Sequence, residues 1–184
     1  QALDACLAHA RSQGAEQFAL LGDLVGYGAD PRYVVQQAMA LAEQGATVLR
    51  GNHDALAIAP PAITDKASQT GATHGAQWTH EQLATDELAF LAQRPLTAVV
   101  HEVLLVHASA DAPERWRYVD NEVVARHCLD AAHHHHGVQH VFCGHVHHQT
   151  LYYRGTGREL MRFSPTPGVP IPVPMVVSMG LALQ

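Results

Sequence analysis

Apolar runs and stretches of helical periodicity alternate along the first third of the chain. Apolar positions three or four apart predict a helix over residues 2–12, which Gly14 ends. Residues 16–23 predict a short buried strand. Asp30 followed by proline predicts a helix start, and that helix runs to about residue 44. A second strand begins at Thr47. This order is a β-α-β unit, which requires the two strands to be parallel.

The remainder of the chain continues to mix helices and strands. Residues 55–69 carry a Pro-Pro pair and are expected to be irregular, and Thr85 is the expected cap of a later helix. The segment "LTAVVHEVLLVHAS" predicts two strands joined at His101 and Glu102. The other expected elements are helices over 71–83, 85–93 and 120–136, strands within 138–154, 158–163 and 175–179, a turn at 155–157 and a proline-rich loop over 164–174.

Composition supports one α/β domain over residues 1–184. The chain is 47% hydrophobic and only 6% aromatic, which is typical of an α/β protein. Eleven basic against 17 acidic residues give a formal charge of −6. That balance argues against a general binder of nucleic acid or anionic membranes.

The cysteines predict a reducing compartment. Cys6, Cys128 and Cys143 are few, odd in number and far apart. No apolar stretch approaches the length of a membrane span. We therefore expect a cytoplasmic protein without a membrane partner.

Polar side chains of one chemical kind follow four apolar strands. They are Asp23 after "ALLG", Asn52, His53 and Asp54 after "TVLRG", His107 after "VLLV", and His145 and His147 after "HVFCG". Ligands of open α/β sheets bind where parallel strands end. A carboxylate, an amide oxygen and imidazoles suit a divalent transition metal, and the lack of a thiol argues against a structural zinc site.

The strand-end motifs resemble those of the calcineurin-like metallophosphoesterases, in particular the small bacterial single-domain branch. The resemblance rests on "GDLVGYGADP", "RGNHDA", "LLVHAS" and "FCGHVHH", in that order, and covers nearly the whole chain. It implies an α/β fold in which helices flank a β-sandwich. It also implies two divalent metal ions, of Mn, Fe, Zn, Co or Ni.

The resemblance assigns a role to each strand-end residue. Asp23 would bridge two metal ions, and His147 would serve one of them. The other metal site would be completed by Asn52, His107 and His145. His53 would donate a proton to the leaving oxygen, and Asp54 would orient His53. A metal-bound hydroxide would then attack the phosphoryl group.

Two departures from the family pattern stand out. The family's Asp-x-His motif, which ends its first strand, is absent, and the chain opens on the helix that follows it. We therefore expect that the first strand is missing because the chain is cut after that motif, which leaves one metal site incomplete with Asp23 and His147. The segment "VVSMGLALQ" only partly matches the family's last active-site loop.

Three function classes are compatible with these residues. The first is a metal-dependent phosphoesterase acting on phosphate mono- or diesters, with a small phosphoester or a phosphoprotein as substrate. The second is a non-catalytic scaffold on the same fold, against which the presence of His53 argues. The third is a metal buffer that uses the histidine run 133–136, which we interpret as a solvated stretch.

Aromatic and glycine residues near the motifs receive structural interpretations. The "GYG" at 26–28 lacks the lysine and the spacing of a phosphate-binding loop. It is interpreted as backbone turning close under the metal site. Trp116 and Tyr118 are expected in the core or in the wall of a cleft.

Overall fold

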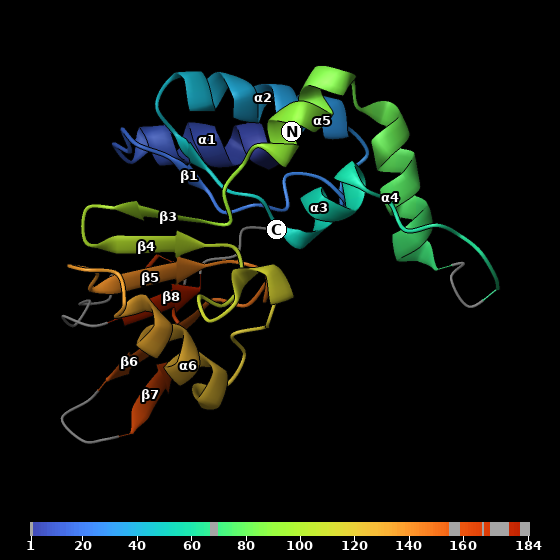
Figure 1. Ribbon diagram of the computed structural model, residues 1–184. Helices are drawn as coiled ribbons and strands as arrows, with labels where there is room; N and C mark the ends of the chain where they lie inside the picture. Colours follow the sequence, from blue (N-terminus) through green and yellow to red (C-terminus); the bar gives the residue numbers. More distant parts are fainter. Residues whose placement is uncertain (1, 67–69, 155–158, 167, 170–176, 181–184) are drawn as a thin grey trace. The chain divides into compact units, whose positions relative to one another are not determined.

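A computed structural model describes residues 2–66, 70–154, 159–166, 168–169 and 177–180 (Figure 1). The chain divides into two compact units, Gln1–Arg94 and Pro95–Gln184. Both contain helices and strands, so the α/β class predicted from the sequence is confirmed. The single-domain organisation over 1–184 stays a prediction.

The first unit is a β-α-β core with further helices. Its elements are α1 (Ala2–Ser12), β1 (Ala19–Leu20), α2 (Pro31–Glu43), β2 (Thr47–Val48), α3 (Asn52–Ile58), α4 (Gly71–Gln82) and α5 (Thr85–Ala92). Strands β1 and β2 are parallel, with Ala19 opposite Thr47 and Leu20 opposite Val48. This confirms the predicted parallel unit, although each strand is only two residues long.

Helix α2 follows the sequence signals closely. The Asp30 side chain accepts a hydrogen bond from the Tyr33 amide, and Pro31 occupies the first turn. The buried positions Val35, Ala38 and Leu41 lie three apart, so they share one face. That face joins a core in which α2, α3 and α5 meet. Its buried members are Val25, Val35, Ala57, Leu83 and Leu91.

Two local predictions in the first unit were wrong. Residues 55–58 are not irregular, because α3 continues from Asn52 to Ile58. The cap of α5 is Ala84 rather than Thr85. The buried Glu87 carboxylate accepts a hydrogen bond from the Ala84 amide at 2.8 Å, and this bond fixes where the helix begins.

The described part of the second unit is a mixed sheet with one α-helix of 11 residues. Its elements are β3 (Thr97–Val100), β4 (Val103–Val106), a 3₁₀ turn (Pro113–Arg115), α6 (Glu122–Ala132), β5 (His140–Cys143), β6 (Thr150–Arg154), β7 (Leu160–Phe163) and β8 (Val177–Gly180). The strand order is β3-β4-β5-β8-β6-β7. Strands β4, β5 and β8 are parallel, and the remaining pairs are antiparallel.

Helix α6 packs on this sheet, as Figure 1 shows. Its buried residues Ala125, Cys128, Leu129 and Ala132 face Leu104, Val106, Val141 and Cys143 of the central strands. The Asn121 side chain caps its start. The helix ends at Ala132, earlier than the predicted residue 136, so the histidines 133–136 form an exposed turn before Gly137. The turn predicted at 155–157 lies outside the described residues.

None of the described helices has the length and hydropathy needed to cross a membrane.

Candidate metal centre

The ends of β1 and β2 lie side by side and bring two motifs of the first unit together. Gly22 has φ +98°, and a Cβ at this position would lie 2.8 Å from the Gly51 Cα. A Cβ at Gly51 would run into the side chain of Asp23. Because neither position leaves room for a side chain, the two strand exits approach more closely than other residues would allow.

Asp23 and His53 are joined through this close approach. The Asp23 Oδ1 accepts a hydrogen bond from the His53 amide at 2.9 Å. Asp23 itself has φ +52°, in the left-handed region that residues other than glycine seldom adopt. The predicted carboxylate ligand is therefore held in a fixed orientation by the first turn of α3.

Asp54 also connects the same two motifs through hydrogen bonds. It is fully buried, and its Oδ1 accepts hydrogen bonds from the amides of Leu24 at 2.9 Å and Val25 at 3.3 Å. Its Oδ2 accepts a hydrogen bond from the Gly51 amide at 2.8 Å. These three bonds make Asp54 a clamp between the loop after β1 and the start of α3. The predicted orientation of His53 by Asp54 stays a prediction.

The His53 ring lies against the loop that follows β1. A Cβ at Gly26, whose φ is +102°, would lie 2.5 Å from the His53 Nδ1. The Tyr27 ring is tilted by 42° to the imidazole, with 4.3 Å between the ring centroids. The sequence interpretation of "GYG" as a close backbone turn fits this position of Gly26. Asn52, the first residue of α3, is partly buried beside His53 in the sequence.

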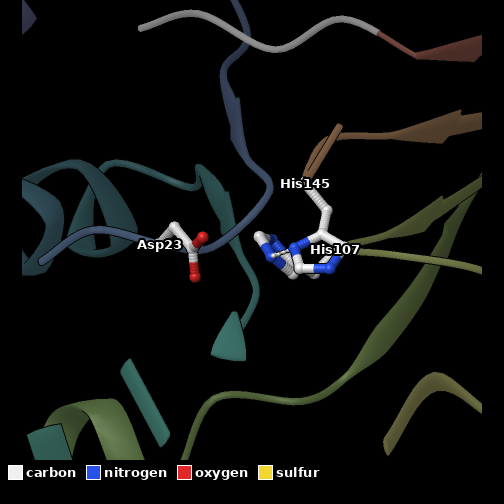
Figure 2. Close-up of side chains that lie close together, drawn as sticks. All are labelled: Asp23, His107 and His145. Carbon is white, nitrogen blue, oxygen red and sulfur yellow. Dashed lines mark hydrogen bonds between the residues drawn. The ribbon is translucent and has the colours of Figure 1, made fainter. Parts of the chain in front are cut away.

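The ends of β4 and β5 bring His107 and His145 together in the second unit. Val106 lies opposite Cys143, and the Gly144 amide donates to the His107 carbonyl at 2.9 Å. The His107 Nε2 lies 3.2 Å from the His145 Nδ1, and both rings are buried. Figure 2 shows this ring contact and also draws Asp23, which belongs to the first unit.

The protonation of His145 follows from its second contact. Its Nε2 lies 2.9 Å from the Trp116 carbonyl oxygen, which can only accept, so Nε2 carries the proton. In the neutral imidazole, Nδ1 is then the bare nitrogen, and it faces His107. Two ring nitrogens directed at each other, one of them held bare by a backbone carbonyl, fit a cation-binding pair.

Aromatic side chains enclose this histidine pair. The Tyr118 ring stacks on the His145 ring, with 4.0 Å between centroids and 19° between planes. The Trp116 ring meets His107 edge-on at 5.8 Å. Tyr118 is 55% exposed, so its placement in the core or a cleft wall was not specific enough to reveal this contact. The only signal in the sequence was its position in the loop after a strand that ends in histidine.

His147 lies two residues beyond His145 and is partly buried. Both have positive φ, +67° for His145 and +55° for His147. Such backbone conformations cost free energy and cluster at functional sites. The seven predicted residues thus form two groups, Asp23, Asn52, His53 and Asp54 in the first unit and His107, His145 and His147 in the second.

Cys128 is a buried residue of α6 in the second unit. Its Sγ accepts a hydrogen bond from the Ala110 amide at 3.3 Å. Burial raises the pKa of this thiol, which keeps it protonated at neutral pH. A protonated thiol is a poor metal ligand, in agreement with a nitrogen and oxygen donor set.

A cavity of about 530 Å³ lies elsewhere in the first unit. Its lining includes Phe18 and Ala46, which precede β1 and β2, whereas Asp23 and Asn52 follow these strands. The cavity is therefore at the opposite end of β1 and β2 from Asp23 and Asn52.

Comparison with known proteins places these motifs in a family. Residues 1–149 match the family model described as calcineurin-like phosphoesterase. An uncharacterized protein of Methanocaldococcus jannaschii is 30% identical over 125 residues, which are 65% of this chain and 49% of that protein. The chain thus spans about half the length of this curated relative.

Two solved structures share the fold. A metallophosphoesterase from Sphaerobacter thermophilus superposes with a TM-score of 0.76 at 26% identity, over 97% of this chain and 69% of that one. A hypothetical protein from Pyrococcus horikoshii OT3 superposes with a TM-score of 0.65 at 15% identity, over 97% and 70% of the two chains. The second likeness concerns the fold alone.

Proposed function

The chain belongs to the calcineurin-like phosphoesterase family, and from this membership we propose that it is a metal-dependent hydrolase of phosphate mono- or diesters. The proposed substrate is a small phosphoester or a phosphoprotein. The proposed location is the cytoplasm, in keeping with the reducing compartment predicted from the sparse cysteines.

The observation that carries the proposal is the His107–His145 pair. Its facing nitrogens are 3.2 Å apart, and the Trp116 carbonyl holds the proton of His145 on the far side of the ring. An imidazole held in one tautomer by a backbone acceptor is the usual arrangement of a histidine that binds a metal.

The proposed metal ligands are the residues to which the family resemblance assigns this role. Two divalent ions, of Mn, Fe, Zn, Co or Ni, would be held by Asp23, Asn52, His107, His145 and His147. Bound there, they would supply Lewis-acid activation of water and of the phosphoryl group. The neutral Asn52 amide would add no negative charge to the ligand set.

His53 has a different role in this proposal. It donates a proton to the leaving oxygen, which departs as an alcohol. Its ring packs against Gly26 and Tyr27. Its main-chain amide donates a hydrogen bond to the Asp23 carboxylate. The main-chain amide of His53 is thus hydrogen-bonded to the carboxylate ligand, which fixes the His53 backbone relative to Asp23.

The test combines anomalous scattering with hydrolysis of model esters. Crystals are measured at the Mn, Fe and Zn edges, and activity is assayed on p-nitrophenyl phosphate and bis(p-nitrophenyl) phosphate. We expect His145→Ala to lose both the metal peaks and activity, and His53→Gln to lose activity while keeping the metal. As a control, the exposed histidines 133–136 are replaced together by alanine, which should change neither.

Each other outcome selects a different function. A wild-type crystal without metal at Asp23 and His107 supports a non-catalytic scaffold. Loss of most bound metal in the variant of 133–136, with His145→Ala unaffected, supports a metal buffer.

A further inference from the structure

Tyr27 is a large side chain that remains exposed although it touches the proposed acid. It is 62% exposed, and its ring centroid lies 4.3 Å from that of His53. The imidazole covers only part of the tyrosine, and much of the remaining surface faces solvent.

The loop that carries Tyr27 is pinned on both sides. Before it, the amides of Leu24 and Val25 are held by the buried Asp54, and Val25 enters the core. After it, Asp30 caps α2. Gly26 lies so close to the His53 ring that a Cβ at this position would be 2.5 Å from the His53 Nδ1. The tyrosine is therefore presented beside the imidazole by a constrained backbone and loses little freedom when it contacts another group.

The position of Tyr27 relative to His53 points to the part of the substrate that it meets. In the proposed reaction His53 lies within hydrogen-bond reach of the leaving oxygen, at about 2.6–3.2 Å. The organic part of the leaving group continues from that oxygen. A ring 4.3 Å from the imidazole is within reach of that organic part.

We propose that Tyr27 is a specificity-determining residue that selects phosphoesters whose leaving alcohol carries a flat, unsaturated ring, and this inference rests on the proposed function. A planar ring gains from stacking on an exposed tyrosine face, whereas a flexible or saturated group gains only apolar contact. The ring is attached directly to the ester oxygen in an aryl phosphate and through a sugar in a nucleotide.

A purely structural role of Tyr27 makes a different prediction. If the ring served only to hold His53, its removal would slow the hydrolysis of every ester by a similar factor. The ratio between ring-bearing and ring-free esters would then be the same in wild type and variant. The decisive quantity is the ratio in the variant divided by the ratio in wild type, because the intrinsic reactivity of each ester cancels in that comparison.

The experiment measures kcat/KM on two matched pairs with the Mn²⁺-loaded protein. The pairs are phenyl and cyclohexyl phosphate, and thymidine 5′-phosphate and 2-deoxyribose 5-phosphate, each also as its methyl diester. The variants are Tyr27→Ala and Tyr27→Phe. Phe163→Ala is the matched control, because this exposed aromatic of β7 makes no ring contact with a predicted site histidine in the described part of the chain.

We expect Tyr27→Ala to reduce the preference for the ring-bearing member by about five- to tenfold. Tyr27→Phe should keep the preference, since the flat face remains, and Phe163→Ala should leave it unchanged. A loss on the phenyl pair alone identifies a directly attached ring, and a loss on the nucleotide pair alone identifies a base.

Two results would overturn the inference. An unchanged preference in Tyr27→Ala, with hydrolysis by wild type, refutes the role of Tyr27 and leaves the proposed function standing. No hydrolysis of any ester by the metal-loaded wild type refutes both.

Discussion

Replacing Asp54 by asparagine tests how the two strand exits of the first unit are held together. The substitution keeps the size and shape of the side chain but removes the charge and one acceptor oxygen. In the structure, the carboxylate accepts hydrogen bonds from Leu24 and Val25 through Oδ1 and from Gly51 through Oδ2.

The expected loss of stability follows from these three bonds. An asparagine amide offers one oxygen, so its NH₂ group must face at least one main-chain N–H. A hydrogen bond to a charged group contributes about 1.5–3 kcal/mol, and a buried donor left unsatisfied costs about 1–3 kcal/mol. Since Asp54 is fully buried, water does not replace the lost bond. We expect Asp54→Asn to lower the free energy of unfolding by about 2–4 kcal/mol.

Urea unfolding followed by circular dichroism measures this change. For an m-value of about 2 kcal/mol/M, the midpoint should fall by about 1–2 M. Asp30→Asn is the matched control in the same unit, because asparagine caps a helix as well as aspartate does. Its midpoint should stay close to that of wild type.

A wild-type midpoint in Asp54→Asn would refute the clamp. If Asp54→Asn kept the wild-type midpoint but lost phosphoesterase activity, Asp54 would act on His53, as predicted from the sequence resemblance. A loss of stability in both variants would show that the removal of negative charge, rather than the lost hydrogen bonds, destabilises the unit.

Three further changes test other contacts. Gly26→Ala puts a Cβ 2.5 Å from the His53 Nδ1, on a residue whose φ is +102°. We therefore expect a loss of activity of at least about 10²-fold and a loss of unfolding free energy of about 1–3 kcal/mol. Retained activity would contradict the close packing of Gly26 on His53. Burial raises the pKa of Glu87, but the Ala84 amide and side-chain donors outweigh it and hold the pKa below its ordinary value of 4.5. Because the pKa is lowered in the folded state, this stabilisation is present above about pH 4.5 and is lost as pH falls through the folded pKa. Glu87→Gln should therefore reduce the dependence of the unfolding free energy on pH in the acid range. An unchanged dependence would contradict this role of Glu87. Tyr152→Phe removes a buried hydroxyl that has no hydrogen-bond partner among the described residues, so unfolding by urea should show a gain of about 1 kcal/mol, and a loss would reveal a partner.

The sequence predicted the strand exits well because each follows a run of apolar residues. It did not predict α3, since a seven-residue helix is too short for periodicity to register and Pro60-Pro61 suggested a loop. The start of α3 depends on the bond between Asp54 and the Gly51 amide. That bond joins a side chain to a main-chain amide, and the pattern of apolar and polar residues does not reveal it.

The aromatic contacts were hidden for a different reason. Tyr27 and Tyr118 occupy loops whose paths depend on residues with positive φ, Gly26 at +102° and Trp116 at +52°. Aromatic residues are usually at least partly buried, yet these two tyrosines are exposed and contact histidine rings, Tyr27 in a tilted and Tyr118 in a stacked arrangement. Their neighbours in space come from distant positions of the chain, which a single sequence does not reveal.

Helix α3 begins at Asn52, and this start makes the three polar side chains of its first turn point in different directions. Successive side chains of a helix point about 100° apart, so no two of these neighbours can be directed at the same atom. In an extended strand, the first and third residues would share a face. An exchange of Asn52 and His53 would therefore keep the composition of the motif, but each side chain would leave the helix in the direction that the other has in the native sequence.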